Sequence, residues 1–564
     1  MRLRRLLLAL LLTFFVSVSY GQDESDTPQE PSSSSVPSPS QAPNAPQNQG
    51  PSARIPNPEY AKLLNSSLYF YMAQRSGKLP PNFPVPWRHD SALDDGKREG
   101  ADLTGGYYDA GDYLKFTFPL SYTLTIVSWG AIEFEQGYRV ANQYNAVLDM
   151  LRWGMDWMQK AHPTKSELYV QVGDLKRDHD YFGDDTNIPQ PRPIYKITAD
   201  KPGTDAAASA AAAFAASSIV FQNTDADYSK SLLNHAIELF EFAETAPYAL
   251  YHNSLPTKDS QEAYGSSQFE DDLVWGALWL YRATNDTAYK QKASDYFDRF
   301  SAKLAGKNNP MDWDDKTGGV YVLGARVDPA TAKYKLEAEK YLDAKVKFSD
   351  KKCSLRDGLM WCGDSSGSNS LQPPMNTAFL MLTYASQVNK DKNETYYPFV
   401  QTQLDYVMGK NPMNTPYVVG IHPNSPLNPH HAGSFAGDIG RIRSSAPNKN
   451  LLLGALVGGP GEDGWYDDDR ENDRQSEVAC DYNAAYQGVL AYQALTNPNP
   501  PYYASVTLGP RPTRRGLPTW AIALIVVLVL LVVFGCAGFF LYRMRHKIRE
   551  MIYRRRMGKT PPYY

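Results

Sequence analysis

Apolar residues recur at helical spacing along most of the chain. Between Tyr60 and Arg75, one helical face carries Leu63, Leu64, Leu68, Tyr71 and Met72. Similar patterns predict helices over about 119–136, 140–161, 204–222, 226–246, 270–284, 287–304, 375–389, 395–408 and 482–495. The stretch Asp205–Val220 is rich in alanine, which favours a helix that packs closely on its neighbours. The pattern therefore predicts an all-α body.

Long connections rich in Gly, Pro and Asp separate these helices. They cover 80–115, 164–202, 349–374 and 409–474, and they hold most of the clusters of charged, His and Trp residues. Long loops in a compact domain are usually functional. This division indicates an enzyme or binding cleft built on an all-α barrel or bundle.

The hydropathy pattern changes at both ends of the chain. Residues 1–21 carry three arginines and an apolar run, which indicates a secretory signal peptide, with an N-terminal membrane anchor as the alternative. Residues 520–542 have no formal charge and are followed by basic residues, which predicts a transmembrane helix with a cytosolic tail at 543–564. A buried core helix is the alternative. Residues 22–53 are a Pro/Ser-rich spacer predicted to be disordered, 54–497 the folded body and 498–519 a stalk.

These assignments predict a single-pass type I membrane protein at the plasma membrane or an internal membrane. Residues 353 and 362 are cysteines that are close enough in sequence to form a disulfide in an oxidising compartment, whereas Cys480 stands alone and Cys536 lies in the predicted span. Asn65, Asn285 and Asn393 begin glycosylation sequons. We expect a monomer.

The charge and the aromatic content of the chain limit the classes of partner and substrate that it can bind. Removing the +3 of residues 1–21 and the +7 of residues 543–564 from the formal net charge of −4 leaves about −14 for residues 22–542. This acidity argues against nucleic acid as a partner and suits a neutral or cationic substrate. Aromatic residues make up 12% of the chain, which fits either a carbohydrate-binding surface or a well-packed core.

The first chemical cluster is 104–116, where Asp109 and Asp112 lie three residues apart on a Gly-rich turn. Such a turn allows both carboxylates to face one cleft, where they can hold and deprotonate a water. A solvated acidic turn or a cation site is the alternative. A second cluster, 458–484, contains Glu477 just before a predicted helix, beside apolar and aromatic neighbours that can raise its pKa. An acidic residue favoured by the helix dipole is the alternative there.

A third cluster contains the adjacent histidines His430 and His431. Adjacent histidines seldom bind one metal, and no Cys or Glu stands at zinc-like spacing, so the cluster does not indicate zinc.

Together the clusters resemble glycoside hydrolase family 9, the inverting cellulases, and the resemblance covers essentially all of 58–495 in order. It rests on segments 68–80, 87–91, 104–116, 170–179, 201–207, 405–412 and 428–484. The resemblance implies an (α/α)6 barrel with an open cleft that cuts β-1,4-glucan with inversion. It implies Asp112 as general base, Asp109 as its partner in orienting water, Glu477 as general acid, His430 as a sugar contact and Asp468 as a supporting residue. It further implies Trp87, His179, His431 and Tyr482 as substrate-binding residues. No cofactor is expected. Calcium near Ser267, Asp271 and Asp272 stays open, because a helix N-terminus also favours acidic residues.

Four positions depart from the family pattern. An Arg is usual at Ala432, an Arg-Tyr pair at Gln372-Pro373, an aromatic residue at Asp473 and a Trp at Phe182. Arg441 and Arg443 follow on the same loop and are candidates to replace the missing cation. None of the four is a proton-transfer residue, so substrate affinity and choice are more affected than mechanism. The sequence thus predicts a membrane-tethered endo-β-1,4-glucanase. The alternative is a membrane-bound glucan-binding protein with weak or no turnover.

Overall fold

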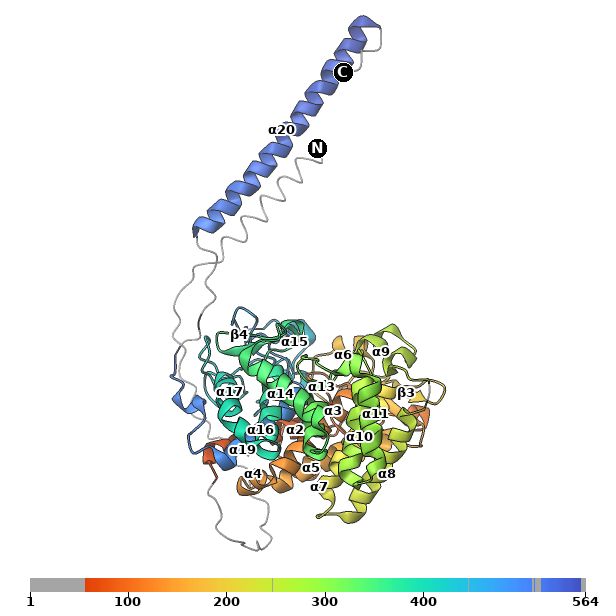
Figure 1. The fold of residues 1–564 in the computed structure, drawn as a ribbon. Coiled ribbons are helices and arrows are strands. Elements are labelled where there is room, and N and C mark those ends of the chain that lie inside the picture. Colours follow the sequence, from red (N-terminus) through yellow and green to blue (C-terminus); the bar gives the residue numbers. More distant parts are fainter. Residues whose placement is uncertain (1–55, 246, 445, 510–511, 513–518, 559–564) are drawn as a thin grey trace. The chain divides into compact units, whose positions relative to one another are not determined.

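The computed structural model describes residues 56–558 apart from 246, 445, 510, 511 and 513–518. The predicted signal peptide and spacer lie outside the described residues. The described chain is mostly helical, and its long helices alternate between two concentric layers (Figure 1).

The inner layer consists of helices that are apolar on nearly every side. They are α3 (Thr117–Glu133), α7 (Thr204–Phe221), α10 (Glu270–Thr284), α13 (Thr317–Val327), α16 (Gln372–Gln387) and α19 (Cys480–Thr496). A helix without a polar face must be surrounded by protein, and almost every residue of α7 is buried. Each inner helix contacts the next, and α19 contacts α3, which closes the ring.

The outer layer consists of helices that bury one face against the ring. They are α2 (Pro58–Ala73), α5 (Tyr144–Ala161), α8 (Ala226–Ala243), α11 (Thr287–Arg299), α14 (Ala332–Lys347) and α17 (Asn393–Val407). Five of them contact an inner helix beside them in sequence, whereas α2 contacts α19, so the two ends of the body meet. The described body is therefore an (α/α)6 barrel, as expected.

Two small antiparallel sheets lie in the connections, where the sequence pattern predicted only loops. One contains β1 (Lys115–Phe116), β2 (Glu167–Val172) and β3 (Ile194–Thr198); the other is the hairpin of β4 (Ser354–Arg356) and β5 (Leu359–Trp361). The predicted disulfide between Cys353 and Cys362 is formed and fastens this hairpin.

Short helices complete the connections. They are α4 (Glu135–Val140), α6 (Leu175–His179), α9 (Lys258–Glu262), α12 (Ser301–Leu304), α15 (Gly363–Ser368), α18 (Ala432–Phe435) and the 3-10 turns η1 (Lys97–Glu99), η2 (Tyr251–Ser254), η3 (Lys390–Lys392), η4 (Ile439–Arg441) and η5 (Tyr502–Ser505). In Figure 1, α6, α9, α15 and β4 lie along the same edge of the body. The loops that carry the candidate chemistry thus gather at one end of the barrel.

The body continues beyond the boundary predicted at Asn497. The hydroxyl of Tyr503 donates to Glu59 at 2.5 Å, and the backbone oxygen of Thr507 accepts hydrogen bonds from Asn414 and Asn424. Val506 is buried. The first part of the predicted stalk is therefore packed on the barrel.

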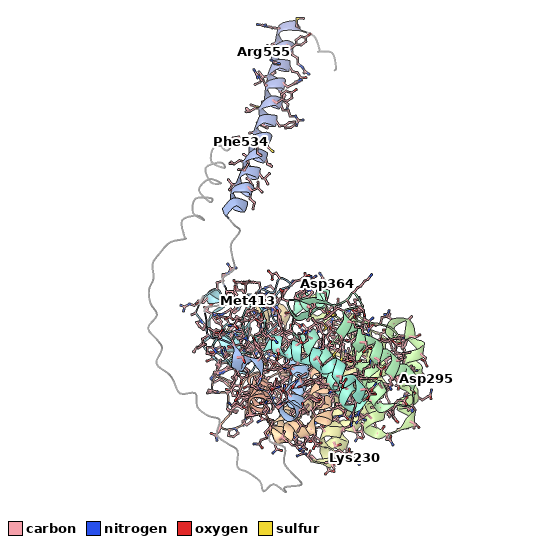
Figure 2. All side chains as sticks on the ribbon, turned by 60° about the vertical axis from the view of Figure 1, so that its left-hand side comes forward. Lys230, Asp295, Asp364, Met413, Phe534 and Arg555 are labelled. Atoms are coloured by element: carbon pink, nitrogen blue, oxygen red, sulfur yellow. A yellow bond between two sulfur atoms is a disulfide. The ribbon has the colours of Figure 1, made fainter. Side chains whose placement is uncertain are left out.

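One further helix, α20 (Thr519–Met557), follows the stalk and contains 39 residues. Among the described residues, two helices are long and apolar enough to cross a membrane, α7 and residues 523–557 of α20. Helix α7 is enclosed in the barrel, whereas the apolar side chains of α20, such as Phe534, are exposed (Figure 2). Helix α20 is thus the candidate membrane span.

Candidate active site

The turn that carries Asp109 and Asp112 leads into β1 and is held from three directions. The backbone oxygen of Asp109 accepts a hydrogen bond from the Cys480 amide at the start of α19 (2.9 Å). The oxygen of Gly111 accepts one from the Ala432 amide at 2.7 Å. A Cβ atom on Gly111 would lie 2.1 Å from the backbone oxygen of His430, so only glycine allows this approach. The turn that carries Asp109 and Asp112 (the base turn), the loop that carries His430 and His431 (the His loop) and the start of α19 therefore meet at one point.

The two carboxylates of this turn have different surroundings. Asp109 is buried, and its side chain accepts a hydrogen bond from the hydroxyl of Tyr264. Asp112 is partly exposed; its Oδ1 accepts from the Leu114 amide (3.1 Å), and its Oδ2 lies 3.2 Å from Nε2 of His179. That hydrogen bond raises the pKa of His179. Asp112 is thus the carboxylate that solvent can reach.

Burial raises the pKa of Asp109 well above its usual range, and the negative charges of Asp481 and Asp112 add to this effect. The hydrogen bond from Tyr264 acts in the opposite direction. The pKa of Glu477 is also raised well above its usual range, first by burial and then by Asp112 and Asp109. Glu477 is therefore suited to hold a proton.

The His loop runs beside Glu477. The His430 amide donates to the Ser476 oxygen (2.8 Å), and His430 and Glu477 form a parallel bridge. Nδ1 of His430 lies 2.5 Å from the backbone oxygen of Arg470, so this nitrogen carries the proton. Asp468 accepts hydrogen bonds from the amides of Leu427 and Asn428, which fixes the start of the loop.

His431 lies in a different environment from the one expected for a sugar contact. Its side chain is buried, its Nδ1 accepts from the Ser434 amide (2.9 Å), and its Nε2 lies 2.7 Å from Oε1 of Gln74. Nε2 of Gln74 in turn donates to the backbone oxygen of Ala110 at 2.6 Å. Because both ring nitrogens are occupied, His431 supports the base turn and offers no free nitrogen to a ligand. Its role as a substrate-binding residue stays a prediction.

The other predicted substrate-binding residues lie around these groups. Trp87 and Tyr482 are partly exposed, and His179 is exposed. The ring of Trp87 contacts that of His431 edge-on, with centroids 5.9 Å apart.

Two aromatic residues at the site were not predicted from the sequence. Tyr264 contacts Asp109, and the ring of Trp313 packs edge-on against that of Tyr264 at 4.8 Å. Tyr264 is an isolated aromatic residue in sequence, while Trp313 lies among Asp312, Asp314 and Asp315, and only the fold brings the two to the base turn.

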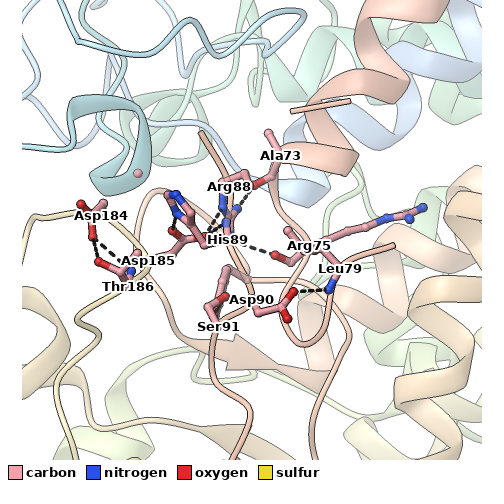
Figure 3. A network of polar contacts seen from close by, with 12 residues as sticks. Ala73, Arg75, Leu79, Arg88, His89, Asp90, Ser91, Asp184, Asp185 and Thr186 are labelled. Carbon is pink, nitrogen blue, oxygen red and sulfur yellow. Dashed lines mark hydrogen bonds and ion pairs between the residues drawn. The ribbon is translucent and has the colours of Figure 1, made fainter. Parts of the chain in front are cut away.

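A network of buried polar contacts supports the wall beside the base turn (Figure 3). Arg88 forms an ion pair with Asp185 at 2.7 Å, with both side chains almost fully buried, and Nδ1 of His89 lies 2.8 Å from the same carboxylate. Asp95 pairs with both Lys115 and Arg192 at 2.7 Å. Because each buried charge has a partner, these pairs fix the loops relative to one another.

Two of the departures from the family pattern, Ala432 and Phe182, lie in one apolar cluster. Ala432 is fully buried in a cluster with Phe182, Phe435, Tyr108, Tyr113 and Ile188. The ring of Phe182 also packs on that of His430, with centroids 4.8 Å apart. Arg443 pairs with Glu471 at the surface, and Arg441 is exposed. An apolar cluster thus occupies this position, and the expectation that Arg441 or Arg443 replaces the missing cation is wrong.

The remaining two departures lie near Glu477. Nε2 of Gln372 donates to Asp481 at 2.6 Å, while burial raises the pKa of Asp481 to about 6. Asp473 is exposed, and its negative charge raises the pKa of Glu477.

The residues considered for calcium already contact protein groups. Asp271 accepts from the Lys316 amide (2.6 Å), Asp272 pairs with Nζ of Lys316 (2.8 Å), and the Ser267 amide donates to Asp314. Within the part of the chain that the structure describes, no three His, Cys, Asp or Glu residues are grouped for a metal. Calcium binding stays an untested prediction.

Comparison with known proteins agrees with this geometry. The model of glycosyl hydrolase family 9 matches residues 60–490. The chain belongs to this family. It is 36% identical to Endoglucanase 15 of Arabidopsis thaliana over 471 residues, which are 77% of this chain and 93% of that protein. It is 40% identical to Endoglucanase B of Cellulomonas fimi over 446 residues, which are 78% of this chain but only 42% of that longer protein.

The barrel also resembles the endoglucanase of the termite Nasutitermes takasagoensis. The TM-score is 0.72 at 40% sequence identity, and the match covers 78% of this chain and 99% of the termite chain. The family 9 fold therefore accounts for the described body and leaves α20 as an addition to it.

Proposed function

We propose that the protein is an inverting endo-β-1,4-glucanase. The observation that carries this proposal is the meeting of the Asp109–Asp112 turn, Glu477 and the His loop at one end of the barrel. Inversion requires a protonated carboxylic acid on one face of the sugar and a carboxylate that activates water on the other. Glu477, whose pKa is raised, suits the first role, and Asp112, whose carboxylate solvent can reach, suits the second.

In this mechanism Glu477 donates its proton to the oxygen of the scissile glycosidic bond. Asp112 accepts a proton from water as the water attacks the anomeric carbon, and the bond to the leaving sugar breaks in the same displacement. Asp109, held by Tyr264, orients the water from the other side of the turn. Since Nδ1 of His430 donates to Arg470, its Nε2 is left as an acceptor for a sugar hydroxyl.

The assignment predicts that Asp112→Asn and Glu477→Gln each lower kcat on amorphous cellulose by about 10²–10⁴-fold, because each removes a proton-transfer group without changing its size. Asp295→Asn, on the exposed surface of α11, is the matched control and should keep normal activity. Proton NMR at early times should show the α-anomer as first product. Activity retained in Asp112→Asn, or a β-anomer, would contradict the roles.

The proposal also includes attachment to a membrane. Helix α20 is exposed along its apolar part and ends in Arg554, Arg555 and Arg556. We place the barrel on the extracellular or lumenal side and the basic end in the cytosol, because positive residues flank the cytosolic end of a span. The protein then acts as a monomer on β-glucan near its own membrane, with the plasma membrane as the favoured location.

A further inference from the structure

A hollow of about 600 Å³ is lined in part by the loop that leads to Glu477. Its volume falls within the usual range of ligand-binding pockets. The hollow is formed by the β4–β5 hairpin, α15 and the loop that leads to Glu477. Its lining consists of Lys351, Lys352, Cys353, Ser354, Arg356, Trp361, Gly363, Asp364, Gly367, Ser368, Glu462 and Arg474.

The lining is positively charged, although the chain between the two basic ends is acidic. Four of the lining residues are Lys or Arg, and two are acidic. Arg356 pairs with Glu462 at 3.1 Å. Within the described residues, Lys351, Lys352 and Arg474 have no carboxylate within ion-pair distance. Three cations therefore face the hollow or its rim outside any ion pair, against one such carboxylate, Asp364, so the lining keeps a net positive charge.

The backbone that presents these cations is held firmly. A buried ion pair joins Lys345 to Asp350 at 2.7 Å, and the second oxygen of Asp350 accepts hydrogen bonds from the amides of Lys352 and Cys353. The disulfide then ties Cys353 to Cys362, whose amide donates to the hydroxyl of Ser366 in α15. The position of the hollow is thus set before any ligand arrives, which limits the entropy lost on binding.

The hollow is connected to the general acid through the chain itself. Arg474 is three residues before Glu477, and its neighbour Asp473 is near enough to raise the pKa of that acid. On the other side, Ser368 leads to Ser370, whose amide donates to Gly458 (2.7 Å), while the Gly458 amide donates to Glu477 (2.8 Å). A glucan chain that lies against Glu477 therefore passes close to the hollow.

We propose that this hollow binds a carboxylate-bearing sugar unit of the β-glucan, such as a glucuronate in a β-1,4-linked chain. This inference rests on the proposed function and adds the class of substrate. A neutral glucan makes no use of three unpaired cations, whereas a uronate carboxylate accepts charge-assisted hydrogen bonds from Arg474 and from the lysines. Trp361 supplies an apolar surface in the same lining.

The experiment compares two substrates of equal length with the full chain in detergent. One is cellohexaose, and the other is cellohexaose in which some C6 groups have been oxidised to carboxylates. We expect a higher kcat/KM for the acidic substrate in the wild type, and we expect this preference to decrease with added salt. In Lys351→Gln/Lys352→Gln and in Arg474→Gln, the ratio of acidic to neutral kcat/KM should fall about twofold to tenfold, since an exposed ion pair changes affinity by a factor of roughly 1.5 to 5.

The control is Lys230→Gln/Lys335→Gln, which removes the same charge from exposed positions outside the lining of the hollow and should keep the wild-type ratio. An unchanged ratio in both hollow variants overturns the proposal, and so does an equal fall on both substrates. Calorimetry of the acidic hexasaccharide with Asp112→Asn measures binding without turnover, so failure of the proposed function and failure of this site remain distinct. Competition by inorganic phosphate at the same concentration as the sugar would show a bare anion site and would overturn the saccharide assignment.

Discussion

At the scale of single residues, Tyr264 controls whether Asp109 in the base turn is ionised. Asp109 is buried beside other carboxylates, and its pKa is raised by that environment. The Tyr264 hydroxyl is the group that favours the ionised form, because it donates a hydrogen bond to the Asp109 carboxylate. Asp109 can hold a water for Asp112 only while it remains an acceptor.

Tyr264→Phe should therefore lower kcat/KM by about 10- to 100-fold, since a hydrogen bond to a charged group contributes about 1.5–3 kcal/mol. The acidic limb of the kcat/KM profile should also move to higher pH, because the pKa of Asp109 rises further without its donor. Tyr251→Phe is the control, since that hydroxyl donates to the backbone oxygen of Tyr264 and not to Asp109. A uniform loss with no movement of the acidic limb would assign Tyr264 to packing alone.

The residues with proton chemistry could be named from sequence, because acidic and His residues cluster in recognisable segments. The structure brings Asp109, Asp112, Glu477 and His430 together, while their roles remain predictions. Tyr264 could not be named, since an isolated aromatic residue has the same local pattern in a core and in a cleft. Trp313 was missed although it lies among Asp312, Asp314 and Asp315, which was a usable signal. The buried state of His431 depends on Gln74, which is distant in sequence and belongs to the C-cap of α2.

At the scale of elements, the close approach of the base turn to the His loop depends on Gly111. No side chain fits between Gly111 and the backbone of His430. Alanine would force the two loops apart, and a misplacement of about 1 Å in a catalytic group costs on the order of 10²-fold in rate.

Gly111→Ala should thus lower kcat about 100-fold while the free energy of unfolding falls by only about 1–3 kcal/mol, the usual cost of overpacking. Activity assays and thermal unfolding of the same preparation separate the two effects. Gly509→Ala is the control, since a Cβ atom there meets no other atom within 4 Å. Wild-type kcat in Gly111→Ala would show that the two loops can move apart without consequence.

The sequence pattern located ten of the barrel helices but missed α13 and α14. Gly318, Gly319 and Gly324 lower the helix propensity of α13, yet the fold requires them. A Cβ atom on Gly318 would lie 2.7 Å from the Tyr341 ring, and one on Gly324 would lie 2.5 Å from the Tyr334 ring. Both rings come from α14, so the same tertiary contact explains why local propensity failed for α13.

At the scale of the whole molecule, the stability of the barrel should depend on the histidine pair between α5 and α8. Nδ1 of His162 lies 2.8 Å from Nδ1 of His235, and His162 is buried. Burial, followed by the nearby His235, lowers the pKa of His162 to about 4. The unfolded chain therefore binds more protons than the folded chain between about pH 6.5 and 4, and the stabilisation is lost as pH falls through that window.

His162→Gln cannot titrate and should remove this contribution, which we estimate at about 3 kcal/mol over the full window. The measurement is the difference in thermal midpoint between wild type and variant at several pH values. Buried carboxylates such as Asp205, whose pKa is raised to about 7, stabilise the fold as pH falls. Because they are present in both proteins, their effect is removed when the two midpoints are subtracted. His422→Gln, at a less buried histidine, is the control. A difference that stays constant from pH 7 to pH 4 would contradict the argument.

The barrel and α20 are joined by a short tether, because the chain is bound to the body as far as Thr507. From Thr507 to Thr519 a fully extended chain spans at most roughly 40 Å. If α20 crosses the membrane, the point where the chain leaves the barrel stays within roughly 40 Å of the start of that helix. The enzyme then meets glucan chains close to the membrane more often than distant ones.

This tether contains Arg514 and Arg515, which are cleavage points for trypsin, whereas the bond after Arg511 is protected by Pro512. With trypsin outside sealed cells, we expect release of an active soluble barrel, while a tag placed after the basic tail remains protected inside the membrane. Replacing Arg514 and Arg515 by Gln should slow this release without changing hydrolysis of cellohexaose. Loss of the tag while the barrel stays attached would reverse the topology, because the positive-inside rule would then have placed the wrong end in the cytosol.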